Sequence, residues 1–104
     1  YTASKGGIEM FTKVAAAELG RYQIRVNCIA PGAIEIERTK HESEDYAASW
    51  GKVTPLGRVG YPADIGKSCV MICSAEAGYI TGQTIWVDGG VFSRAIWPAE
   101  GRDS

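Results

Sequence analysis

The stretch Arg25-Val-Asn-Cys-Ile-Ala-Pro-Gly32 decides the fold class of this chain. Its apolar residues point to both sides of an extended segment, which is typical of a parallel strand buried between two layers of helices. Pro31 and Gly32 are expected to end that strand. A second short strand is expected over 84–87, before Asp88-Gly89-Gly90, a turn that needs positive φ.

Helical patterns flank both strands. Apolar residues recur at three- and four-residue steps along 1–20, and Gly20 stands where a C-terminal cap belongs. A second helix is expected to begin at Pro62, because proline suits the first helical turn. The stretch 33–60 is expected to be a long irregular loop, with room for a short helix over 35–50.

The order helix, strand, long loop, helix, strand is that of the last part of an alternating α/β chain. We therefore expect an α/β fold that forms the C-terminal part of a Rossmann-like doubly wound parallel sheet. Residues 1–104 are expected to form a single partial domain with 91–104 as its tail, because two short strands leave sheet edges open. Tyr1 already lies inside the first expected helix, so we expect the chain to be a piece of a longer protein.

Composition argues against several classes of protein. The chain has 104 residues, 45% of them hydrophobic, and a formal net charge of −1, which is ordinary for a globular domain. Eleven Lys and Arg balance twelve Asp and Glu without a basic run, which argues against a nucleic-acid partner. No apolar stretch approaches the ~20 residues that span a membrane. Three cysteines without metal-ligand spacing predict no metal site and, with no secretory leader, favour a cytoplasmic location.

Tyr1-Thr-Ala-Ser-Lys5 is a Tyr-x-x-x-Lys pair. On a helix the two side chains lie one turn apart on the same face. An ammonium beside a phenol favours the phenolate, and a Tyr tuned in this way can act as general acid or base between an alcohol and a carbonyl. The alternative is a structural pair of exposed side chains, because this spacing also arises by chance in a chain with five Tyr residues.

The Tyr-x-x-x-Lys pair is one of several blocks that follow one another in a fixed order. The blocks span 1–5, 26–32, 55–65, 79–83 and 87–90. In this order and spacing, residues 1–92 resemble the C-terminal portion of the short-chain dehydrogenase/reductase family. Within that family they are most similar to the group that contains the 3-oxoacyl-carrier-protein reductases and the bacterial glucose dehydrogenases.

The resemblance implies roles for five residues. Tyr1 would be the catalytic acid or base at the substrate oxygen. Lys5 would lower the pKa of Tyr1 and hold the ribose hydroxyls of the nicotinamide cofactor. Pro31 and Gly32 would form the turn beside the nicotinamide, and the backbone of Ile34 would hold its carboxamide.

The resemblance also implies NAD or NADP as cofactor and a small-molecule carbonyl or secondary alcohol as substrate. Residues 33–60 would include the substrate lid. The sequence has no Gly-rich pyrophosphate loop after a strand, and Ile36 replaces a threonine that usually helps to bind the cofactor. We therefore expect the isolated chain to be inactive.

A different hypothesis is a stand-alone chain that oligomerises and has a binding or structural role. Open sheet edges and the apolar first helix would then pair between copies. We expect the partner to be either a second copy of the chain or a missing N-terminal half. His41 is expected to be solvated, the three cysteines to be buried apolar side chains and the three tryptophans to be packing or interface anchors.

Overall fold

The computed structural model describes residues 2–36 and 45–93. The expectations for Tyr1, His41 and Trp97 lie outside these residues. The tail after position 93 and positions 37–44 of the predicted loop also lie outside the described residues.

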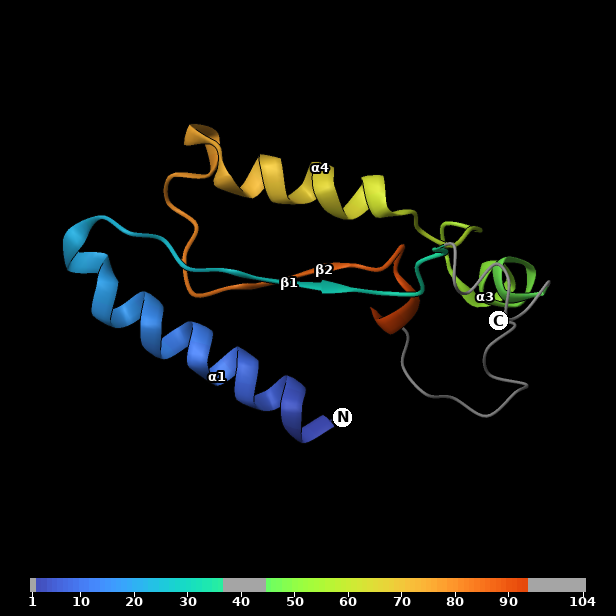
Figure 1. Cartoon of the computed structure of the whole chain (residues 1–104), viewed down its shortest axis with the longest axis horizontal. Coiled ribbons are helices and arrows are strands. Elements are labelled where there is room, and N and C mark those ends of the chain that lie inside the picture. The colour runs from blue at the N-terminus through green and yellow to red at the C-terminus, as the bar shows by residue number, and fades with distance from the viewer. Residues whose placement is uncertain (1, 37–44, 94–104) are drawn as a thin grey trace.

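Helices cover both faces of a parallel sheet that has two strands within the described residues. The elements are α1 (Thr2–Leu19), β1 (Cys28–Pro31), α3 (Tyr46–Val53), α4 (Pro62–Cys73) and β2 (Thr84–Val87). The helix α1 contacts β1 on one face, and α4 contacts both strands on the other (Figure 1). The predicted α/β architecture and the parallel pairing of its strands are thereby confirmed.

The carboxyl ends of β1 and β2 lie at the same edge of the sheet. The strands pair in parallel over their full length, with Ala30 opposite Trp86. Beyond the strands, the Gly32 N–H donates a hydrogen bond to the Val87 oxygen at 3.0 Å. A Cβ added to Gly32 would lie 2.7 Å from the Asp88 Cβ, so this close approach of two chain segments requires glycine.

At the amino edge of the sheet, side chains of the 26–32 and 79–83 blocks hold the two segments together. The Asn27 amide donates to the Ile80 oxygen at 3.0 Å and accepts from the Gln83 N–H at 3.1 Å. The Val26 N–H donates to the Thr81 hydroxyl at 3.0 Å. These bonds join the start of the 26–32 block to the 79–83 block at the edge of the sheet opposite Pro31.

The end of α1 differs from the prediction at Gly20. Gly20 opens a 3₁₀ turn, η1 (Gly20–Tyr22), and the left-handed residue is Gln23, with φ of 63°. The Gln23 N–H donates to the Gly20 oxygen at 2.9 Å. The predicted glycine cap is therefore wrong, because the helix tightens into one further turn before the chain reverses.

The start of α4 follows the prediction. Pro62 is its first residue, and Asp64 closes the first turn. The Asp64 carboxylate accepts from the Tyr61 N–H at 2.8 Å, while the Asp64 N–H donates to the Tyr61 oxygen at 2.8 Å. This reciprocal pair satisfies N–H groups that a helix start would otherwise leave without partners.

The second predicted strand and its turn are also confirmed. The strand β2 occupies 84–87, and Gly89 and Gly90 have φ of 61° and 91°. A short 3₁₀ turn, η3 (Val91–Ser93), follows. Between α4 and β2 lies another 3₁₀ turn, η2 (Ala75–Ala77).

A helix, α3 (Tyr46–Val53), overlaps the end of the stretch 35–50, within which a short helix is predicted, and is followed by the buried Thr54. Positions 37–44 of that stretch lie outside the described residues. The Thr54 hydroxyl donates to the Trp50 oxygen at 2.7 Å. Tyr46 and Ala47 are the half-buried residues of its first turn, and charged residues dominate the sequence before them. Packing of these two residues stabilises α3, because a helix gains most of its stability from an apolar face.

Few apolar side chains are buried in the described part of the chain. The buried ones there are Ala16, Val59 and Ala77, and no large side chain is fully buried. Large exposed side chains on the two long helices are Ile8, Met10, Phe11, Val14, Val70 and Met71. The sheet therefore has cover on both faces, but the helices that cover it also carry exposed apolar side chains.

The cysteines illustrate this incomplete burial. Cys28 and Cys69 are half-buried, whereas Cys73 is exposed, and all three are free thiols. The expectation that all three are buried is wrong, because Cys73, the last residue of α4, lines a surface cavity with Arg25 and Asn27 and stays exposed. Among the described residues, no helix is both long and apolar enough to cross a membrane.

Candidate active site

The carboxyl edge of the sheet gathers Lys5, Pro31, Gly32 and Ile34. Because α1 runs back along the sheet, its first turns lie beside this edge (Figure 1). Pro31 ends β1, and the two residues that follow it carry the chain over the edge. Ligands of open α/β sheets bind outside the carboxyl ends of the strands, so the position fits the predicted site. Tyr1 precedes the described residues.

A cavity of about 240 Å³ lies between the start of α1 and the sheet. Its lining residues are Ser4, Lys5, Ile8, Glu9, Cys28, Ile29, Ala30, Pro31, Thr84 and Trp86. Two of the predicted site residues, Lys5 and Pro31, therefore face one space. The cavity is slightly smaller than typical ligand pockets of ~300–1,000 Å³, so it suits part of a ligand rather than a whole dinucleotide.

The Lys5 ammonium lies over aromatic rings. Its Nζ is 4.6 Å from the ring centroid of Trp86 and 5.3 Å from that of Phe92. The two rings meet edge to face, with centroids 5.5 Å apart and planes at 63°. The sequence predicts Trp86 as a packing or interface anchor and contains no signal for this cation–π contact, because the residues that form it are far apart in the chain.

The backbone of Ile34 lies opposite Gly60 and leaves its own polar groups on the other side. Ile34 and Gly60 form an isolated parallel bridge. The bridge uses the Gly60 N–H with the Ala33 oxygen and the Glu35 N–H with the Gly60 oxygen, both at 2.9 Å. In a parallel bridge, the middle residue's own N–H and C=O point to the opposite side. Ile34 therefore presents one donor and one acceptor away from Gly60, the pair that a primary amide can match.

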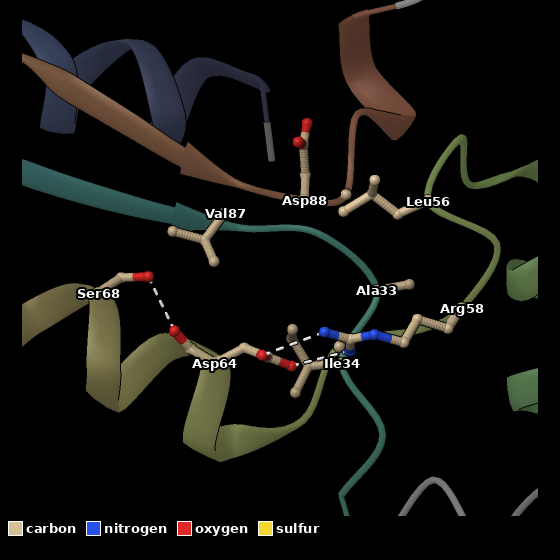
Figure 2. A pocket seen from close by; sticks show the side chains of 10 residues that line it. Ala33, Ile34, Leu56, Arg58, Asp64, Ser68, Val87 and Asp88 are labelled. Carbon is tan, nitrogen blue, oxygen red and sulfur yellow. Dashed lines mark hydrogen bonds and ion pairs between the residues drawn. The ribbon is translucent and has the colours of Figure 1, made fainter.

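A second cavity of about 170 Å³ lies on the α4 face (Figure 2). In it, an Arg58 guanidinium nitrogen lies 3.0 Å from an Asp64 carboxylate oxygen. Hydrogen bonds from Arg58, and then from the Tyr61 N–H, hold the pKa of Asp64 below its ordinary value. The same pairing raises the pKa of Arg58. This ion pair stabilises the start of α4. Both of its residues belong to the 55–65 block, so the pair agrees with a structural role for that block.

The Asp88 carboxylate points away from the Arg58–Asp64 pair (Figure 2). Its two oxygens accept hydrogen bonds from the Gly90 N–H at 2.9 Å and from the Phe92 N–H at 3.2 Å. Asp88 therefore shapes the turn rather than offering a free acid to a ligand. In the described part of the chain, no three His, Cys, Asp or Glu side chains come close enough to hold a metal ion.

Comparisons with known proteins give the family of this chain. Residues 1–92 match the family model described as enoyl-(acyl carrier protein) reductase. The chain is 46% identical over 91 residues to the 3-oxoacyl-[acyl-carrier-protein] reductase of Chlamydia trachomatis, an alignment that covers 88% of this chain and 37% of the relative.

Solved structures agree with the sequence matches. The 3-oxoacyl-[acyl-carrier protein] reductase of Brucella melitensis has a TM-score of 0.82 and 41% identity, covering 88% of this chain and 34% of that one. An Agrobacterium tumefaciens dehydrogenase with bound NADP has a TM-score of 0.79 and 38% identity, covering 90% of this chain and 39% of that one. The chain thus spans little more than a third of the length of the proteins it matches. With both its sequence and its fold matched, the chain belongs to the short-chain dehydrogenase/reductase family.

Proposed function

We propose that this chain carries the Tyr–Lys pair and one wall of the nicotinamide site of an NAD(P)-dependent oxidoreductase. Its reaction interconverts a carbonyl and a secondary alcohol of a small molecule. The observation that carries the proposal is the meeting of Lys5 and Pro31 in one cavity, which runs along the α1 face of the sheet and reaches its carboxyl edge at Pro31. The matched Agrobacterium structure, which holds NADP, supports the choice of cofactor.

Each site residue then has a defined task. NAD(P), when bound, supplies or accepts the hydride. Tyr1 gives a proton to the carbonyl oxygen during reduction and removes it from the hydroxyl during oxidation. The positive charge of Lys5 favours the phenolate of Tyr1, and its donors suit ribose hydroxyls. The outward N–H and C=O of Ile34 would hold the carboxamide, beside the turn at Pro31 and Gly32.

Even with its other segments, the chain supplies only part of such an enzyme. We assign 1–104 to a single partial domain, with 33–60 as the segment that includes the substrate lid and 91–104 as the tail. The sequence contains no Gly-rich pyrophosphate loop, and Ile36, which is 44% exposed, brings no hydroxyl to the cofactor. The chain by itself is therefore proposed to be inactive, and its cytoplasmic location stays a prediction.

A second candidate is an oligomerising chain with a binding or structural role. It is favoured by the exposure of apolar side chains on both covering helices, such as Phe11 at 70% and Val70 at 73%. Such faces suit either a second copy of the chain or the remainder of the fold.

The test is the oxidation of NADH or NADPH with a panel of ketones, measured on the isolated chain and on a longer protein that contains it. In the active protein, Lys5→Ala is expected to lower kcat by at least about 100-fold, because tuned acid–base catalysis is worth ~10²–10⁴. Lys13→Ala is the matched control, since Lys13 is exposed on the same helix. An unchanged kcat in Lys5→Ala would contradict the proposed role, and turnover by the isolated chain would contradict its predicted inactivity.

A further inference from the structure

Two aromatic residues that the proposed mechanism does not use lie against its central lysine. The Nζ of Lys5 is 4.6 Å from the ring centroid of Trp86 and 5.3 Å from that of Phe92. Both distances lie within the ~6 Å over which an aromatic face attracts a cation. Lys5 and Trp86 also line the same cavity at the carboxyl edge. The rings are therefore placed where they can influence the position of the ammonium.

The sheet determines the position of Trp86. Trp86 lies inside β2, and its pairing partner on β1 is Ala30. A methyl side chain beside the indole leaves room for the ring to lie along the sheet, toward the first turns of α1. Because 41% of Trp86 is exposed, burial in a core does not account for the orientation of its ring.

The turn after β2 determines the position of Phe92. The Asp88 carboxylate accepts hydrogen bonds from the N–H groups of Gly90 and Phe92. Gly89 and Gly90 both have positive φ, which folds the chain back toward the strand. The Phe92 ring then meets Trp86 edge to face at 5.5 Å, an arrangement that aromatic pairs favour. The turn thus supports the indole from the side.

We propose that Trp86, with Phe92 against it, is a positioning residue that holds the Lys5 ammonium at the carboxyl edge of the sheet. The inference rests on the proposed function, in which the charge of Lys5 acts on Tyr1 and on the cofactor ribose. Aromatic rings suit this task because they attract a cation without carrying a negative charge. A carboxylate in their place would neutralise the positive charge that a phenolate needs.

The ammonium has three N–H donors, so contact with rings on one side leaves donors for an oxygen on another. The lysine stem has four rotatable bonds, and a ring contact that narrows its range places the charge where the reaction uses it. Removal of the indole should therefore lower the rate without removing the substrate site. That result differs from the one expected if Trp86 only stabilises the fold.

The first measurement detects the contact without any activity. In ¹H–¹³C NMR spectra of the longer protein that contains the chain, the ring currents of Trp86 are expected to shift the Lys5 ε-methylene protons upfield of those of Lys13. Trp86→Leu is expected to remove that shift, and Trp86→Phe to keep part of it. Tyr79→Leu is the matched control, because Tyr79 is fully exposed and lies in the block at the amino edge. Lys5 protons that are not shifted would overturn the proposal.

The second measurement is kinetic, on the protein in its active form. Trp86→Leu is expected to lower kcat about two- to fivefold, as the loss of an exposed cation–π contact predicts, with the KM for the carbonyl substrate unchanged. Trp86→Phe should restore most of the rate. In a Lys5→Ala background, Trp86→Leu should have no additional effect, because the two residues act through one contact. Circular dichroism of each variant checks that the fold persists.

Four results would distinguish a failure of the positioning role of Trp86 from a failure of the proposed function. A normal kcat in Trp86→Leu, or an equal loss with and without Lys5, would overturn the positioning role. A loss that Trp86→Phe does not restore would assign Trp86 to the fold and overturn the role as well. If Lys5→Ala itself keeps the wild-type kcat, the proposed function fails, and the inference that depends on it fails too, whatever the NMR shift shows.

Discussion

Gly32 shows how tightly the carboxyl edge of the sheet is built. A Cβ at this position would lie 2.7 Å from the Asp88 Cβ and 2.8 Å from the Asp88 Cα. Neither atom can move without shifting the turn after β2. Gly32→Ala is therefore expected to destabilise the fold by about 1–3 kcal/mol, the usual cost of overpacking. The measurement is urea unfolding followed by circular dichroism.

The matched control is Gly66→Ala. Gly66 lies inside α4, and a Cβ built there meets no other atom within 4 Å. Because alanine favours a helix by ~1 kcal/mol over glycine, this variant should be as stable as the wild type or more so. Equal stability of the Gly32 and Gly66 variants would show that the close approach at Asp88 is not maintained in solution.

Asp64 gives the fold a pH dependence whose sign is defined. Its pKa is lowered in the folded chain, first by the hydrogen bond from Arg58 and next by the Tyr61 N–H. A lowered pKa means that the folded state binds the proton more weakly than the unfolded state. The stabilisation is therefore complete above the unfolded pKa of ~3.9 and is lost as the pH falls through the lower, folded value. Melting temperatures from pH 7 down to pH 2 should show this acid-side decline.

The variant Asp64→Asn tests the assignment of that decline. An amide cannot titrate, so the variant should be less stable at neutral pH and should lose less stability on acidification than the wild type. The pair is exposed, and its ionic part should weaken in high salt. An acid-side decline that is as steep in the variant as in the wild type would assign it to other carboxylates.

Among the elements, the turn after β2 depends on a side chain at its start. Asp88 accepts from the Gly90 and Phe92 N–H groups, so Asp88→Ala is expected to loosen η3 while the strand pairing persists. Native-state hydrogen exchange should show faster exchange of the Phe92 amide, by about tenfold for each ~1.4 kcal/mol of lost local stability. The Cys28 amide, which donates to the Gln83 oxygen, should be unchanged.

Asp45→Ala serves as the control for this turn. Asp45 stands at the N-cap of α3 but makes no side-chain capping bond there. Its removal should leave the exchange of both reporter amides unaltered. A Phe92 amide that exchanges equally in the wild type and in Asp88→Ala would show that the turn keeps its shape without the carboxylate.

For the whole molecule, the apolar outer faces of the covering helices predict association. Exposed patches of this kind on a chain of 11.2 kDa favour contact with a second copy or with the remainder of the fold. Sedimentation of the isolated chain should therefore give a mass above that of the monomer. Phe11→Ser should weaken the association, because 70% of Phe11 is exposed.

Lys13→Ser on the same helix is the matched control and should leave the mass unchanged. A monomeric chain that unfolds in one cooperative step would contradict the prediction of association. A chain that orders only when the longer protein supplies the rest of the fold would favour the enzyme part over the stand-alone oligomer.

Local patterns predicted much of this architecture, and their failures have physical causes. Strand β2, the start of α4 at Pro62 and the positive φ of Gly89 follow from residues that are neighbours in sequence. The end of α1 was predicted less well, because packing rather than propensity decides where a helix stops.

The candidate site divides in the same way. The order of the elements, the family and the residues proposed for the site follow from the sequence, because periodicity, turn residues and motif spacing are local. Three features follow only from the folded chain: the cavity that Lys5 and Pro31 share, the backbone of Ile34 directed away from Gly60 and the place of Trp86 under the ammonium. These contacts join residues far apart in the chain. The first and the third arise because α1 packs back across a parallel sheet, and the second because Gly60 pairs with the segment after β1.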